Sequence, residues 1–199
     1  MFPNPRLFRR DPASSRSRRS RGIRRLCRLA VLAALYVLLT MVSVRVGNLR
    51  LTFASLPVVA AALLLGPWEA AAVALTGEFL NQMLAYGFTA TTALWLLPPA
   101  IRGLTVGAFS VRCLRSGRLP EERPAALYAV CMAAAVLTTV CNTAVLGVDA
   151  RIFGYYTPAL LTGDLAVRLL TGAVTAVLVT TVALPLVRLL RRELAAGRA

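Results

Sequence analysis

The stretch that decides the fold is Gly66–Gly103, which reads GPWEAAAVALTGEFLNQMLAYGFTATTALWLLPPAIRG. It contains two apolar segments, each long enough to enter a bilayer. Both segments are interrupted by residues that are polar or that break helices: Glu78, Asn81, Gln82, Pro98, Pro99 and Arg102. Because ionisable groups at membrane depth are costly, they usually face the interior of a helix bundle or a watery cavity, and they mark functional sites. The stretch therefore predicts a helical hairpin that forms the wall of a buried polar pocket.

The composition is that of an integral membrane protein. Of the 199 residues, 58% are hydrophobic, and the mean hydropathy is +0.69. These values are too apolar for an ordinary soluble domain of this length. The length itself fits one domain built as one helical bundle.

The net charge of +15 is carried by arginine, and its placement indicates a membrane protein rather than a nucleic-acid-binding one. Ten of the 23 basic residues lie between Arg6 and Arg28, and others cluster in 112–123 and 188–198. Basic blocks that flank apolar segments are retained on the cytoplasmic side of a membrane. The N-terminal tail could contact phosphates, but no recognition domain follows it. We therefore expect anionic membrane lipids as its contacts, and no nucleic acid.

The chain contains neither histidine nor lysine. These absences exclude metal sites that use His, catalysis by Ser–His or Cys–His pairs, Schiff-base chemistry and the lysine of an ATP-binding P-loop. No nucleophile–base pair is visible elsewhere, so we expect neither an enzyme nor a metal or other cofactor. The four cysteines lie in apolar segments without CxxC spacing, and we expect buried, reduced thiols.

The apolar pattern predicts an all-α integral membrane protein, a bundle of six transmembrane helices. The expected helices are approximately 26–44, 56–65, 68–86, 91–114, 125–146 and 158–190. Between the first two, residues 45–55 alternate apolar and polar side chains, which suits a short extended segment near the outer face. We expect residues 1–25 to be a disordered Arg/Ser-rich tail, 26–190 to be the membrane domain and 191–199 to be a basic C-terminus.

The arginine distribution also predicts the orientation. Six helices that follow a cytoplasmic tail place both termini and the loop 112–124 in the cytoplasm, and these segments hold the arginine clusters. The outer loops then carry only Arg45, Arg50 and Arg151. This bias supports N and C termini on the cytoplasmic side.

Polar residues from several helices converge when each is placed by depth. Arg102 on the fourth helix should reach a depth similar to that of Glu78 on the third, and Asn142 lies near the outer end of the fifth. On the last helix, Asp164 and Arg168 are four residues apart and therefore share one face. The residues that we expect to bind a substrate are Arg45, Asn48, Arg50, Glu78, Asn81, Gln82, Trp95, Arg102, Asn142, Asp164 and Arg168.

Two interpretations of these charges compete. Glu78–Arg102 and Asp164–Arg168 could be ion pairs that only fix the register of the helices, since a buried charge without a partner is costly. Alternatively, the same residues line a pocket for a polar, anionic solute that enters from outside. Pro98 and Pro99 have no backbone N–H, so carbonyl groups one turn earlier lack their usual donors and must be satisfied locally or by a ligand. This favours the interpretation as a pocket. Flat faces for an aromatic ring could come from Tyr86, Phe88, Trp95 and Phe153.

Four stretches of the chain resemble the substrate-binding membrane subunit, or S component, of energy-coupling factor (ECF) vitamin transporters. They are RLAVLAAL (28–35), NLRLTFASLPVVAAALLLGPWEAAAVALTGEFLNQML (48–84), PPAIRGLTVG (98–107) and CNTAVLGVD (141–149). The resemblance covers about residues 26–190. The folate type is the most similar, because Asn142-Thr143 lies within an apolar fifth helix. This chain has Glu78 where the folate type often has Asp.

The resemblance implies a function that fits the absences. S components bind a vitamin and have no ATPase of their own; they dock on a separate transmembrane coupling subunit that two cytoplasmic ABC ATPases drive. Ala30 and Ala34 resemble the small-residue docking surface of the first helix, and small residues four apart also allow close helix contact in lipid. The implied location is a prokaryotic plasma membrane. Pantothenate, a queuosine-type base or cobalamin remain alternative solutes.

Two further classes stay open at this point. A small secondary transporter would need no ATPase, although 199 residues leave little room for paired inverted repeats unless the chain dimerises. A purely structural subunit would tolerate neutral replacement of Glu78 and Arg102 without losing a ligand.

Overall fold

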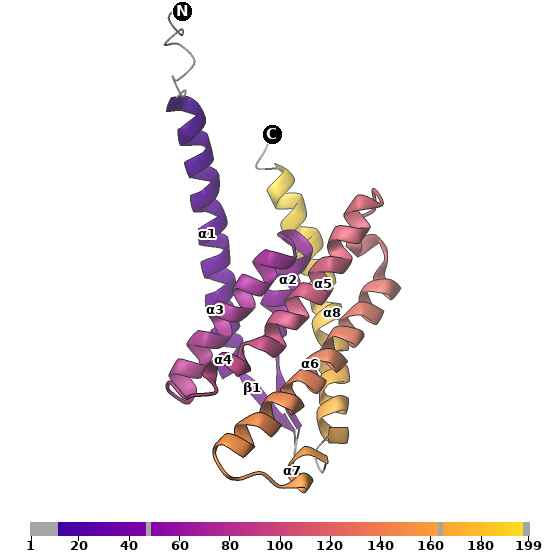
Figure 1. The fold of residues 1–199 in the computed structure, drawn as a ribbon. Coiled ribbons are helices and arrows are strands. Elements are labelled where there is room, and N and C mark those ends of the chain that lie inside the picture. The colour runs from indigo at the N-terminus through magenta and orange to yellow at the C-terminus, as the bar shows by residue number, and fades with distance from the viewer. Residues whose placement is uncertain (1–11, 47–48, 163–164, 197–199) are drawn as a thin grey trace, which may run out of the picture.

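The computed structural model describes residues 12–46, 49–162 and 165–196, with side chains described for 22–42, 52–159, 161–162 and 165–193. The described chain is helical apart from one short β-hairpin (Figure 1). Its elements in chain order are α1 (Pro12–Met41), β1 (Ser43–Val46), β2 (Leu49–Thr52), α2 (Ser55–Leu64), α3 (Pro67–Ala85), α4 (Thr92–Trp95), α5 (Leu97–Arg115), η2 (Pro120–Glu122), α6 (Pro124–Ile152), α7 (Pro158–Thr162) and α8 (Leu165–Ala196).

The six predicted helices correspond to α1, α2, α3, α5, α6 and α8, so the helical bundle is confirmed. The predicted fourth helix is divided, because α4 ends at Trp95 and α5 begins at Leu97. Pro98 and Pro99 lack a backbone N–H, and they therefore fit the first turn of the new helix. The predicted end of the fifth helix at residue 146 is also wrong, since α6 continues to Ile152.

The beginning of α1 corrects the expected disordered tail. Residues 12–25 form the first part of α1, whereas residues 1–11 lie outside the described residues. Arginine is a good helix former, and a helix that is nucleated in an apolar segment extends into such a sequence at little cost. For the same reason α8 continues to Ala196 and includes most of the expected basic C-terminus.

The extended segment predicted within residues 45–55 is part of a hairpin of two antiparallel strands. Val44 pairs with Leu51, and Arg45 pairs with Arg50. The local alternation of side chains predicted extended backbone, but it did not predict that the chain folds back on itself.

The two ends of the bundle hold different elements (Figure 1). The beginning of α1, the end of α8 and η2 lie at one end, which we call the terminal end. The β-hairpin, α4 and α7 lie at the opposite end, which we call the hairpin end. α3 and α5 are neighbours along the bundle and connect the two ends.

Three helical segments of the described chain are long and apolar enough to cross a membrane: Thr92–Arg115, Pro124–Ile152 and Leu165–Glu193. Only a third of the residues in their apolar windows are buried inside the protein, so the other side chains face outward, as in lipid-facing helices. α2 is a shorter apolar helix. That six helices span the membrane, with both termini in the cytoplasm, stays a prediction. Cys113 and Cys131 are buried, but Cys27 is exposed and Cys141 is only partly buried, which corrects the expectation that all four free cysteines are buried.

The terminal end is closely packed through small residues. A Cβ atom added at Gly107 on α5 would lie 2.4 Å from the Cα of Pro67, at the start of α3. One added at Gly103 would lie 3.0 Å from the carbonyl carbon of Ala70. Glycines four residues apart therefore let α5 approach the backbone of α3, as small-residue motifs do in membranes. Beside this contact, Val58–Leu63 of α2 are buried in the core.

Candidate functional site

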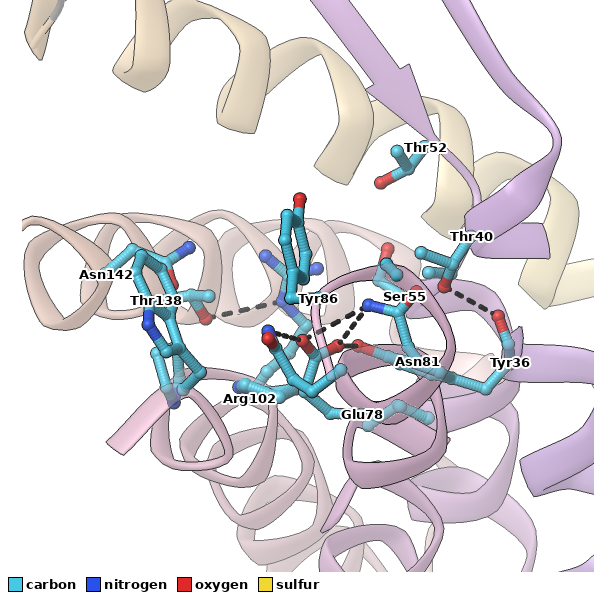
Figure 2. Close-up of a pocket in the computed structure, with 17 residues that line it drawn as sticks. Tyr36, Thr40, Thr52, Ser55, Glu78, Asn81, Tyr86, Arg102, Thr138 and Asn142 are labelled. Atoms are coloured by element: carbon cyan, nitrogen blue, oxygen red, sulfur yellow. Dashed lines mark hydrogen bonds between the residues drawn. The ribbon is translucent and has the colours of Figure 1, made fainter. Parts of the chain in front are cut away.

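A cavity of about 370 Å³ opens at the hairpin end, among α1, α2, α3, α5 and α6 (Figure 2). Its volume lies within the range of small-molecule sites. Polar and aromatic side chains form most of its wall: Tyr36, Thr40, Thr52, Ser55, Glu78, Asn81, Gln82, Tyr86, Trp95, Arg102, Thr138 and Asn142. We call this space the main cavity.

The carboxylate of Glu78 is held on one side of the main cavity by three neutral donors (Figure 2). The hydroxyl of Tyr36 and the side-chain amide of Gln82 each donate a hydrogen bond of 2.7 Å, and the amide of Asn81 donates one of 3.3 Å. Gly77 allows the first of these contacts, because a Cβ atom there would lie 2.7 Å from the ring of Tyr36. The absence of a side chain at this position therefore brings α1 close enough to reach Glu78.

Arg102 projects into the same cavity from the second turn of α5. Its Nε donates a hydrogen bond of 3.4 Å to the hydroxyl of Thr138 (Figure 2). Within the described part of the chain, the side-chain ion pairs are Arg25–Glu69 and Arg191–Glu121, and neither includes Arg102. The Glu78–Arg102 ion pair that we considered is therefore not formed. A guanidinium group with no described carboxylate within 4.0 Å lines the cavity instead.

A second cavity, of about 520 Å³, adjoins the main cavity and is lined in part by α8. The two cavities share Thr52, Arg102, Thr138 and Asn142 as wall residues. The second is lined by Arg168 and by several hydroxyl groups, which come from Thr139, Thr171 and Thr175. The hydroxyls of Thr138, Thr139 and Thr171 donate to carbonyl groups one turn earlier, at 2.6, 2.9 and 2.7 Å, so their oxygens remain available as acceptors.

A third cavity, of about 470 Å³, lies on the other side of the main cavity. It shares Gln82, Tyr86 and Trp95 with the main cavity, and its remaining wall residues are Thr89, Thr91, Asp149, Phe153 and Tyr155. We call it the aromatic chamber.

The hydrogen bond from Tyr155 to Asp149 raises the pKa of the Tyr155 hydroxyl, because the carboxylate favours the protonated phenol.

Comparisons with known proteins give the family. A family model described as "ECF-type riboflavin transporter, S component" matches residues 21–192. This chain belongs to that family. The resemblance to ECF S components is thereby confirmed, and the family is one of membrane transport subunits rather than of enzymes. The folate subtype stays a prediction.

The fold of this S component is also that of a solved relative. A structure described as "Structure and mechanism of the S component of a bacterial ECF transporter" aligns with a TM-score of 0.57 at 18% sequence identity. The alignment covers 88% of this chain and 98% of the other. A search of the curated proteins found no match.

The S component brings most of the predicted site residues together. Glu78, Asn81, Gln82, Trp95, Arg102 and Asn142 line the main cavity, and Arg168 lines the second cavity. Asn48 and Asp164 lie outside the described residues. Arg45 and Arg50 are paired across the hairpin, but their side chains are not described. Phe88, one of the expected aromatic walls, lies outside all three cavities, whereas Tyr86 and Phe153 line them.

Several wall residues of the S component were not predicted. Tyr36, Thr40, Ser55 and Thr138 are neutral polar residues inside apolar helices, and their positions in the sequence carry no charge signal. Tyr36 offered the only usable hint, since it is a single tyrosine in the apolar run of α1. Ala30 and Ala34, the predicted docking residues, are exposed on α1, where a partner can reach them.

Proposed function

We propose that this chain captures riboflavin from outside a prokaryotic cell and delivers it to a membrane coupling subunit driven by two ABC ATPases. The family model, which names riboflavin, supports this substrate. The observation that carries the proposal is the position of Arg102, a half-buried guanidinium that lines two adjoining cavities, with no carboxylate within 4.0 Å in the described residues. Such a group favours a ligand that supplies acceptors, because a cation at membrane depth is costly without partners.

The wall chemistry fits the two parts of riboflavin. Its flat three-ring system has two carbonyl groups, to which Arg102 can donate hydrogen bonds. It also has an N–H group, which can donate a hydrogen bond to the carboxylate of Glu78. Trp95 and Tyr86 provide flat faces for the rings. The hydroxylated chain of the vitamin fits the second cavity, where threonine oxygens accept hydrogen bonds.

The transport cycle that we propose uses no cofactor on this chain, since ATP acts only on the partner subunits. The hairpin end faces outward and the terminal end faces the cytoplasm, where the basic segments contact anionic lipids. The coupling subunit docks on the α1 face that carries Ala30 and Ala34. Replacing either alanine with tryptophan should abolish uptake in cells while vitamin binding by the purified protein persists. Undiminished uptake by both variants would remove the docking proposal.

Folate is the second candidate substrate, and one observation favours it. Two arginines, Arg102 and Arg168, line the second cavity, and the tail of folate carries two carboxylates that such cations bind. Riboflavin has an uncharged tail. Replacement of Arg168 should therefore affect the binding of folate more than the binding of riboflavin.

A titration with both vitamins tests the proposal. Purified protein in lipid nanodiscs should bind riboflavin more tightly than folate, and Arg168→Gln should change riboflavin affinity by less than about threefold. Folate, if it is the substrate, should bind more tightly than riboflavin and lose about tenfold or more in the same variant, since a charge-assisted hydrogen bond is removed. Mass spectrometry of small molecules that copurify with the protein provides an independent readout. Binding of neither vitamin would contradict the proposed function.

A further inference from the structure

The carboxylate of Asp149 joins three segments at the hairpin end. Thr91 in the loop before α4 and Tyr155 in the loop after α6 both donate hydrogen bonds to it. The indole Nε1 of Trp95, on α4, donates a third at 3.4 Å. Asp149 itself is on α6 and is only 9% exposed. The residues before α4 and those after α6 are therefore held to one buried group.

In the part of the chain whose side chains are described, this carboxylate has no cation as its partner. Among the described residues, the ion pairs are Arg25–Glu69 and Arg191–Glu121, so the three neutral donors are what stabilise the charge of Asp149. The nearest arginine along α6, Arg151, stacks on the ring of Tyr156 at 4.6 Å instead. A buried carboxylate is costly unless it accepts several hydrogen bonds. The arrangement is thus stable only while all three segments stay in place.

Trp95 is the member of this group that reaches the ligand site. Its side chain lines both the main cavity and the aromatic chamber, so the indole ring is part of the wall between them. Tyr86 and Gln82 complete the same wall from α3. The orientation of the ring decides whether the main cavity is closed on this side or continuous with the chamber.

We infer that Asp149 is a positioning residue for ligand capture: it holds Trp95 and the two loops so that the main cavity is closed toward the aromatic chamber. The inference rests on the proposed function for what the cavity holds, although the position of Trp95 does not depend on it. Asp149 does not line the main cavity, and it acts on the ligand through Trp95.

The replacement Asp149→Asn is the sharpest test. Asparagine keeps the shape of the side chain, but its NH₂ group cannot accept a hydrogen bond. Thr91 and Trp95 donate to Oδ1, and Tyr155 donates to Oδ2. In asparagine either the NH₂ group faces Trp95 and removes its acceptor, or the amide oxygen accepts from Trp95 in a weaker, uncharged hydrogen bond. In both orientations Trp95 gains freedom to move. The chain has two tryptophans, and Trp68 is 75% exposed on α3, away from the cavities. In a Trp68→Phe parent, fluorescence reports on Trp95 alone.

The experiment compares the parent with Asp149→Asn in lipid nanodiscs, first without ligand. We expect acrylamide to quench Trp95 more strongly in the variant, with emission shifted to longer wavelength. With riboflavin, we expect dissociation to be about tenfold faster, which corresponds to the loss of roughly one hydrogen bond to a charged group. Arg151→Gln is the matched control, because it changes a charge on the same turn of α6 without touching a cavity. It should behave like the parent.

Unchanged quenching of Trp95 in Asp149→Asn would overturn the inference. Failure of the parent to bind riboflavin would instead contradict the proposed substrate, and the quenching comparison would still decide the role of Asp149. If Asp149→Asn does not fold, Tyr155→Phe and Thr91→Val each remove one donor and leave the carboxylate in place. In both variants acrylamide should quench Trp95 more strongly than in the parent. Quenching equal to that of the parent in both variants would also overturn the inference.

Discussion

The same pair of helices, α3 and α5, makes a close contact at the terminal end and opens a cavity at the hairpin end. At the terminal end, Gly103 and Gly107 let the two backbones approach until no side chain fits between them. Toward the hairpin end, the helices carry Glu78 and Arg102, and both residues line a cavity of about 370 Å³. The comparison shows that the size of the side chains along one helix pair sets where the bundle is solid and where it is hollow.

The two regions are also linked along the sequence. Arg102 immediately precedes Gly103, so the cation that lines the cavity is next to the close contact. A disturbance of the packed end therefore moves the wall of the site. In membranes, where apolar burial between helices adds little, such packing contacts supply much of the association energy.

The largest effect is expected from filling the close contact. Gly107→Leu forces a side chain into the backbone of Pro67, where even a Cβ atom would lie 2.4 Å from Cα. Overpacking of this kind costs about 1–3 kcal/mol or more. We expect little monodisperse protein in size-exclusion chromatography after detergent extraction. Gly22→Ala is the control, since nothing lies within 4 Å of a Cβ atom added there. A fully folded Gly107→Leu protein would contradict the packing argument.

The next largest effect is expected at the open end. Arg102→Ala removes the cation that lines both adjoining cavities, and vitamin affinity should fall on the order of 100-fold, as when charge-assisted hydrogen bonds are lost. Calorimetric titration measures this change. Arg102→Lys keeps the charge but loses the planar fork, and it should recover only part of the affinity. Asn142→Ala, on the opposite wall, should cost about tenfold. Unchanged affinity in both alanine variants would mean that the ligand binds elsewhere.

A smaller effect is expected from the ion pair at the terminal end. Arg191 Nε lies 2.7 Å from Glu121 Oε1, and an Nη of Arg191 donates to the carbonyl of Leu63 at 3.0 Å. Glu121 is buried, whereas Arg191 is partly exposed, so solvent screens the charge left by Glu121→Ala. We expect a loss of about 1–2 kcal/mol, seen as a lower unfolding temperature, with vitamin affinity retained. A drop in affinity at unchanged stability would show that this pair serves the site rather than the packed end.

The fold was predictable wherever the signal was local. Apolar runs, the Gly66-Pro67 boundary and arginine blocks located six helices, because each depends on neighbouring residues. The same local logic missed the break before α5, where Pro98 lies in the first turn of a new helix instead of inside a continuous one. It also missed the pairing of β1 with β2, which depends on where the chain turns.

The site was predictable to the extent that charge at membrane depth is rare. Glu78 and Arg102 were found by this criterion, and they do line one cavity. Whether they contact each other depends on the distance between α3 and α5, which Gly103 and Gly107 set through contacts that the sequence pattern does not specify. The bonds of Asp149 to Thr91 and Trp95 join residues 58 and 54 positions apart, and no spacing rule predicts them.

The smallest effect tests whether the donors of Glu78 matter to the ligand. Tyr36→Phe removes the 2.7 Å hydrogen bond from α1 but keeps the ring that packs against Gly77. Asn81 and Gln82 still donate to the carboxylate, so the loss should be about 1 kcal/mol, or roughly fivefold in riboflavin affinity. Gln82→Leu, which removes a donor on α3 itself, provides the comparison. A larger loss in Tyr36→Phe than in Gln82→Leu would indicate that the hydroxyl of Tyr36 contacts the vitamin directly, and α1 would then contribute a ligand contact as well as a wall of the main cavity.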